Sequence, residues 1–345
     1  MMKRSVPIAV AMVLAAALVA PAQVGDVNKI LADARAALGG DKKLDAVKTL
    51  AMTGRTLRTA PSGLTMEGDF EATIALPDKF VRRDMVANLG NMSIYRMSGF
   101  NGDGVINEMD QPPQLAGGGN IIIHQRVGSG GTFTSSGGAP PTPEEQEAIR
   151  KATIVTAKQD FTRLTLGIFA GSFPSYPLTM TYAGQAESPD GKADIVEVKG
   201  EGDFAAKLFI DATSHLPLML SWMAKEPLQI TNRQVGGPGG GTVVIKGGGM
   251  DLTKSGGTSQ APPAKMTPEE REKMAKDFEA QAREADSKRR IVEYRLFYAD
   301  YRSVDGVMVP FRLQRSVDGK PTEEITFEKV KVNGKIDEKI FTVSK

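Results

Sequence analysis

The sequence of 345 residues has no cysteine, only two histidines and one tryptophan. Without cysteine there is neither a disulfide framework nor a site for a lipidated N-terminal cysteine. The two histidines, His124 and His215, are too few and too far apart for a metal site with helical spacing, so we expect no metal. No Gly-x-Ser-x-Gly elbow is present either. We therefore expect neither catalysis nor a cofactor.

The chain has almost no excess of either charge. It also has no long apolar run after residues 6–19. Lys3 and Arg4, the apolar residues 6–19 and the Ala20-Pro21-Ala22 site together have the form of a secretory signal. We expect cleavage near Ala22, a periplasmic or secreted chain, and no transmembrane span in the mature protein. Removing Lys3 and Arg4 leaves 41 basic against 41 acidic residues. A balance of this kind gives no field for nucleic acid.

The last third of the chain alternates apolar and polar residues with the period of half-buried strands. The even positions Val292, Tyr294, Leu296 and Tyr298 are apolar or aromatic, with the charged Glu293 and Arg295 between the first three, and a similar run follows from Val307 to Leu313. Asp305-Gly306 and Asp318-Gly319 separate these runs, and Asn333-Gly334 ends the next one. Asp-Gly between alternating runs is a strong hairpin signal. The sequence thus predicts an antiparallel meander.

The same alternation fills the first third, where we expect four or five strands between Leu50 and Met97. Two helices are expected beside the strands. The first is capped by Asp26 and stopped by Gly39-Gly40. The second begins at Thr142-Pro143 and presents an apolar face of Phe161, Leu164, Thr165, Ile168 and Phe169, so it is our candidate for a plug or lid over the sheet.

Two segments rich in Gly and Pro, 112–143 and 236–266, interrupt the strands, and a highly charged helix is expected over 267–290. We therefore predict a signal peptide at 1–22 and a single domain at 23–345 that carries these two insertions and the charged helix. The bland interpretation of 267–290 is a solvated connection between two strands. The alternative is a docking element for an envelope protein partner.

Apolar residues on the predicted dry face mix methionine with aromatic side chains, which adapt to irregular shapes. They either form an ordinary core or leave part of a concave face open to an apolar ligand. With the plug or lid helix, the candidate ligand-binding residues are Met52, Met66, Phe70, Phe161, Ile168, Met180, Tyr182, Leu220, Trp222 and Tyr294.

Two details of the last strands are also predicted. The acid pair Glu323-Glu324 is assigned to a strand edge or a wet face, where solvation explains it. The apolar positions are odd at Ile325 and Phe327 but even at Val330, and this shift by one residue predicts a β-bulge near Glu328-Lys329.

Several strand and turn motifs resemble the LolA-like superfamily of periplasmic lipoprotein carriers. They are Asp300-Tyr301-Arg302-x-x-Asp305-Gly306-x-x-x-Pro310, Phe327-x-x-Val330-x-x-Asn333, Ile336-Asp337-x-x-x-Phe341 and Leu208-Phe209-Ile210-Asp211-x-x-Ser214-x-Leu216-Pro217. This resemblance implies a mainly β fold: an unclosed antiparallel β-barrel, or half-barrel, of about ten or eleven strands around helices that act as plug and lid.

Two functions follow from these observations. The first is an exported carrier or binder of a lipid-like ligand, such as a lipid or the acyl chain of a lipoprotein, on the concave face of the half-barrel. The second is a non-catalytic envelope module for protein interaction or sensing, which uses the same fold and the charged helix 267–290.

Overall fold

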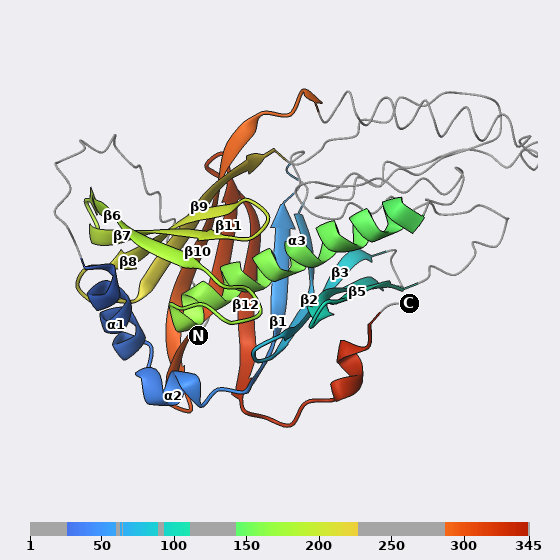
Figure 1. Ribbon diagram of the computed structural model, residues 1–345, viewed down its shortest axis with the longest axis horizontal. Helices are drawn as coiled ribbons and strands as arrows, with labels where there is room; N and C mark the ends of the chain where they lie inside the picture. Colours follow the sequence, from blue (N-terminus) through green and yellow to red (C-terminus); the bar gives the residue numbers. More distant parts are fainter. Residues whose placement is uncertain are drawn as a thin grey trace, which may run out of the picture.

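The alternating segments form one antiparallel sheet of twelve strands in the computed structural model of the protein (Figure 1). The structure describes residues 26–59, 63, 65–88, 93–110, 143–226 and 287–343. The first strands are β1 (Thr49–Thr59), β2 (Thr65–Ala75), β3 (Lys79–Asn88), β4 (Ser93–Asn101) and β5 (Gly104–Met109). The middle strands are β6 (Thr179–Ser188), β7 (Gly191–Gly200), β8 (Phe204–Asp211) and β9 (Pro217–Lys225). The last are β10 (Ile291–Val304), β11 (Val307–Val317) and β12 (Lys320–Val332).

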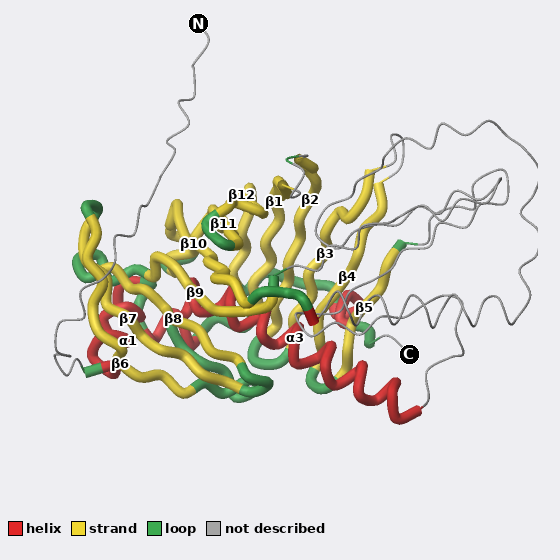
Figure 2. Tube along the Cα trace, turned by 90° about the horizontal axis from the view of Figure 1, so that it is seen from above, coloured by secondary structure: helices red, strands yellow, loops and turns green. Residues whose placement is uncertain are grey.

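The strand order is β5-β4-β3-β2-β1-β12-β11-β10-β9-β8-β7-β6. Among the described strands the first therefore pairs with the last, and β5 and β6 lie at the two edges of the sheet. The sheet curves into an arch that does not close (Figure 2). The predicted mainly β, unclosed antiparallel half-barrel is confirmed, with twelve strands rather than ten or eleven.

Hairpin turns set the register as the sequence predicted. Asp305 and Gly306 have φ angles of 51° and 81°, and Asp318 and Gly319 have 50° and 74°. Both central residues of each turn are thus left-handed, as a type I′ hairpin requires. The bulge is confirmed as well: Thr53 pairs with Lys329 but Gly54 pairs with Phe327, so Glu328 is the extra residue.

In the described ranges three α-helices accompany the sheet, namely α1 (Val27–Ala37), α2 (Asp41–Asp45) and α3 (Pro143–Phe169). The Asp26 carboxylate caps α1 by accepting a hydrogen bond of 2.9 Å from the Asn28 amide. Helix α3 runs along the inside of the arch (Figures 1 and 2). A short 3₁₀ helix, η1 (Glu338–Phe341), places Phe341 in a separate small apolar cluster with Val81 and Ile106.

The second half of α3 is buried on all sides. The predicted apolar face, which covered one side of the helix, therefore includes only part of the buried surface. From Phe161 to Ala170 every residue except Arg163 is buried. Two of them, Thr162 and Thr165, satisfy their hydroxyls within the helix by donating to the carbonyl oxygens four residues earlier, at 2.8 and 2.9 Å. Because its hydroxyls are paired internally, this half of the helix tolerates full burial as a plug.

Several predictions fall outside the described residues. These are the signal peptide, the Thr142 cap, and nearly all of the segments 112–143, 236–266 and 267–290. The single-domain organisation and the docking role of the charged helix stay predictions. In the part of the chain that is described, no helix combines the length and apolar character that crossing a membrane would need.

Candidate functional site

The ten predicted ligand-binding residues fall into two groups by burial. Buried are Met52, Phe70, Phe161, Ile168, Leu220 and Trp222, which belong to one continuous apolar cluster between α3 and the sheet. Half-buried are Met66, Met180, Tyr182 and Tyr294. Strand register brings residues of both groups together, because Tyr294 pairs with Trp222 and the two rings stack at 5.4 Å. A role of these residues in ligand binding stays a prediction.

Tyrosine hydroxyls fix the buried half of α3 inside the arch. Tyr298 on β10 donates to the Arg163 carbonyl oxygen. The Tyr301 hydroxyl lies 2.8 Å from the Gly167 carbonyl oxygen and 2.9 Å from that of Pro217 on β9. Burial raises the pKa of both tyrosines, so they stay neutral donors at physiological pH.

Replacing Tyr301 by Phe is expected to loosen the plug. The change removes the single hydroxyl proton that the Gly167 and Pro217 carbonyl oxygens share, and we expect a loss of about 1–2 kcal/mol in the free energy of unfolding. Hydrogen exchange of the amides in the last turns of α3 should speed up in parallel. Unchanged stability and unchanged exchange would mean that packing alone holds the helix.

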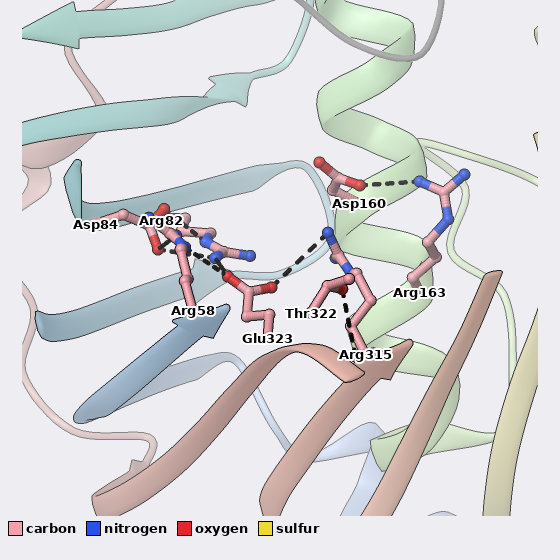
Figure 3. A network of polar contacts seen from close by, with 8 residues as sticks. All are labelled: Arg58, Arg82, Asp84, Asp160, Arg163, Arg315, Thr322 and Glu323. Carbon is pink, nitrogen blue, oxygen red and sulfur yellow. Dashed lines mark hydrogen bonds and ion pairs between the residues drawn. The ribbon is translucent and has the colours of Figure 1, made fainter. Parts of the chain in front are cut away.

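The concave face also has charged side chains, although none of the ten predicted ligand-binding residues is charged. This arginine cluster consists of Arg58, Arg82, Arg96, Arg163 and Arg315 with the carboxylates Asp84, Asp160 and Glu323, seven of which are drawn in Figure 3. Register explains their meeting: Glu323 on β12 is paired with Arg58 on one side and Arg315 on the other, and directly paired residues share a face. Asp160 and Arg163 come from helix α3, which lies on the concave side of the sheet.

Two carboxylates tie together the arginines of the sheet. Glu323 Oε1 accepts from Arg58 Nε at 3.0 Å and from Arg82 Nη2 at 2.9 Å. Asp84 accepts from Arg58 Nη2 at 2.7 Å and from Arg82 Nε at 2.6 Å. Arg315 Nη1 lies 3.8 Å from Glu323 Oε2, an ion pair rather than a hydrogen bond. The Glu323 side chain is only 10% exposed.

Electrostatics in the cluster keeps its groups ionised. Burial opposes the charge of Glu323, but Arg82, Arg315 and Arg58 outweigh it and hold its pKa well below the ordinary value of 4.5. For Arg82, burial is likewise outweighed by Asp84 and Glu323, so its pKa lies above the ordinary value. Arg96, on β4 opposite Asp84, has its pKa lowered mainly by burial.

Two hollows border these elements. The larger, of about 340 Å³, is a cleft at one end of the arch between α1, α2 and the end of α3, lined by Leu44, Val47, Leu76, Phe169, Phe173 and the polar Arg35, Asp45 and Lys48. The smaller, of about 40 Å³, lies within the arginine cluster, against Arg82, Asp160, Arg163, Arg315 and Glu323. Only the larger falls within the roughly 300–1,000 Å³ typical of small-molecule pockets.

The assignment of Glu323 to a wet face is wrong, whereas Glu324 does point outward to Arg312. A signal for the cluster was present in the alternation itself. Arg58 follows Met52, Gly54 and Thr56 at the inward positions of β1, so a charge at that position predicts a buried ion pair. The residues of the described ranges contain no group of three or more His, Asp and Glu arranged to hold a metal ion.

Comparison with known proteins gives likeness of structure only. No family model matches the sequence, and no curated protein matches it. The structure is similar to that of a LolA superfamily protein from Nitrosomonas europaea, at 9% identity and a TM-score of 0.43 over 91% of this chain and 96% of the other. A DUF1329 family protein from Desulfovibrio piger matches at 9% identity and 0.44 over 92% and 97%. A domain named for outer membrane lipoprotein sorting, from Vibrio parahaemolyticus, matches at 10% identity and 0.42 over 92% and 97%.

Proposed function

We propose that the protein is an exported carrier that binds an acyl-chain ligand against the concave face of its half-barrel. One observation carries this proposal: the apolar inner side of the arch extends beyond the helix that covers it. Along the edge strand β6 the inward residues Met180 and Tyr182 are only half-buried, although Met180 packs on the main apolar cluster. Tyr294 is half-buried in the same way beside Trp222.

An acyl chain suits such a surface for physical reasons. Burial of apolar area contributes about 25 cal/mol per Å², or roughly 0.8 kcal/mol for each methylene that leaves water. Methionine and aromatic side chains can follow the irregular outline of a flexible chain. The buried second half of α3 fills the middle of the arch, so the chain would lie beside the helix, along the inner side of β6.

The first test is direct. Protein purified from the cell envelope is examined by native mass spectrometry and by organic extraction, and refolded protein is titrated with saturated acyl chains of ten to sixteen carbons. Each added methylene that is buried should tighten binding by about fourfold, which is the 0.8 kcal/mol above expressed as a ratio. A protein that is always empty and shows no dependence on chain length is not a carrier.

A variant on β6 locates the binding surface. Met180→Glu places a charge where we expect the chain to lie, and the cost of desolvating it should weaken binding by tenfold or more. Thr181→Glu adds the same charge to the outward side of the strand, where the residue is exposed, and is the matched control. Equal binding by the two variants would place the ligand elsewhere, the cleft beside α1 and α2 being the next surface to probe.

A further inference from the structure

The small pocket within the arginine cluster has an unbalanced charge. Among the residues that line it, the three arginines Arg82, Arg163 and Arg315 outnumber the two carboxylates Asp160 and Glu323 by one. The whole arginine cluster, which adds Arg58, Arg96 and the Asp84 partner of Arg82, also has more arginines than carboxylates. Figure 3 shows Arg315 between Glu323 on β12 and the Asp160–Arg163 pair on α3. The remaining wall is apolar. One monovalent anion would make this wall neutral.

Two arginines that line the pocket each have a buried hydrogen-bond donor without a partner. The Nε atoms of Arg163 and Arg315 are buried and have no hydrogen-bond partner among the described residues. A buried donor without an acceptor costs roughly 1–3 kcal/mol, and more for a charged group, so such atoms are rare in folded proteins. Both arginines line the same pocket, Arg163 from α3 and Arg315 from β11, so an acceptor placed between the two side chains is one way to satisfy these donors.

Aromatic rings hold the planes of the arginines. Arg163 Cζ lies 4.6 Å from the centroid of the Trp222 ring and 5.4 Å from that of Phe204. Arg82 Cζ lies 4.9 Å from the centroid of Phe70. Because contact with a ring uses the face of a guanidinium group, the N–H groups in its plane stay available for a carboxylate or a similar acceptor.

Arg163 and Arg315 also repel each other. Burial lowers the pKa of Arg163, Asp160 opposes this effect, and the charge of Arg315 adds to it. The two cations therefore destabilise each other across the pocket. An anion between them would relieve that repulsion while accepting hydrogen bonds from both.

We propose that the space between Arg163 and Arg315 binds the carboxylate of the acyl ligand, so that the protein selects a fatty acid by its head. This inference rests on the proposed carrier function. The pocket has a volume of about 40 Å³, and since about 10–15 Å³ holds one water molecule, three atoms of that size fit. A carboxylate has three non-hydrogen atoms. The apolar side chains of Leu164, Leu296 and Leu313 belong to the same wall.

The test compares ligands that differ only in the head. Hexadecanoic acid, hexadecanol and hexadecylamine are titrated against the wild-type protein above pH 7, with free acetate as a fourth ligand. Charged hydrogen bonds to two arginines should make the acid bind at least about tenfold more tightly than the alcohol. The amine should bind more weakly than the alcohol. An acid and an alcohol that bind equally well would overturn the inference and leave the carrier function standing.

Variants then assign the preference to the two arginines. Arg315→Gln and Arg163→Gln should each reduce the ratio of acid to alcohol affinity to below threefold, with the affinity for the alcohol changed by less than twofold. Arg312→Gln is the matched control, because Arg312 lies on the same strand and pairs outward with Glu324 at 2.8 Å. A ratio that survives both changes at the pocket would refute the site, and the wild-type comparison stands even if a variant fails to fold.

Each failure is distinguishable from the others. Binding of no chain at all, with any head, contradicts the carrier function itself. Binding of acetate that depends on Arg163 and Arg315, with no binding of hexadecanoic acid, would show that the anion is a small free acid and would overturn the assignment to an acyl ligand.

Discussion

Glu323→Gln is expected to lower the free energy of unfolding at pH 7 by about 3–5 kcal/mol, the usual result of removing one partner from a buried ion pair. The carboxylate stands between Arg58, Arg82 and Arg315, and its side chain is 10% exposed. An amide of the same shape keeps the packing but leaves the guanidinium groups of Arg58, Arg82 and Arg315, whose side chains are 19%, 17% and 30% exposed, with Asp84 as their remaining carboxylate on the sheet. Urea denaturation, with CD as the readout, measures the loss.

The neighbouring residue supplies the control. Glu324→Gln removes the same charge one position along β12, from a pair with Arg312 in which both side chains are 32% exposed or more. A pair of this kind contributes about 0–1 kcal/mol. Similar losses in the two variants would show that the free energy comes from general surface charge and not from the arginine cluster.

The dependence of stability on pH is an independent test of the same prediction. Because the pKa of Glu323 is lowered by folding, its contribution is complete above its ordinary pKa of 4.5 and is lost as the pH falls toward the folded value. The wild type should therefore lose stability below pH 4.5 by up to about 1.4 kcal/mol per pH unit from this group, and Glu323→Gln should not. The gap between the two proteins narrows with acid, and a constant gap from pH 7 to pH 3 would contradict the assignment.

Local signals in the sequence predicted the strands and turns because the physics behind them is local. Asp305-Gly306 forms a hairpin since both residues take left-handed φ angles, and this preference belongs to the two residues themselves. The bulge at Glu328 was equally visible, because a change from odd to even apolar positions has no other explanation within a continuous strand. Knowledge of the partner strand was not needed.

The arginine cluster could not be assembled from local signals. Arg58, Arg82 and Glu323 lie on three different strands, and their meeting depends on the pairing of β1 with β12, which joins the two ends of the chain. A carboxylate on a strand has a default explanation in solvation, so Glu323 could not be separated from Glu324 until the register was known. The bulge in β12 and its pairing with β1 determine that Glu323 points to the concave side and Glu324 to the outside.

The sequence predicted that α3 covers the sheet, but not that its second half is buried on all sides. Apolar spacing from Phe161 to Phe169 gave one face, whereas the arch surrounds this part of the helix. Gly167 shows how closely: a Cβ atom at this residue would come within 2.4 Å of the Tyr298 ring. Contact on that side depends on a tyrosine about 130 positions away, which the spacing within the helix does not reveal.

Gly54→Ala is expected to be the other severe substitution, and its cause is backbone rather than charge. Gly54 lies where the bulge at Glu328 bends β12 across β1, and a Cβ atom there would lie 2.0 Å from the Thr326 carbonyl oxygen and 2.8 Å from the Phe327 Cα atom. No side-chain rotation relieves a clash with backbone atoms, so the two strands must separate. We expect a loss of about 3 kcal/mol or more in the free energy of unfolding, at the upper end of overpacking effects.

Gly334→Ala is the matched control, because it adds the same methyl group just past the end of β12. Its nearest contact is the Lys331 side chain at 3.3 Å, which can move away, so stability should change by less than about 0.5 kcal/mol. Since β1 and β12 join the two halves of the arch, separation at Gly54 should also disturb the ion pair of Arg58 with Glu323 four residues along β1. A double mutant with Glu323→Gln should therefore lose less stability than the sum of the single losses, and full additivity would show that bulge and cluster are independent.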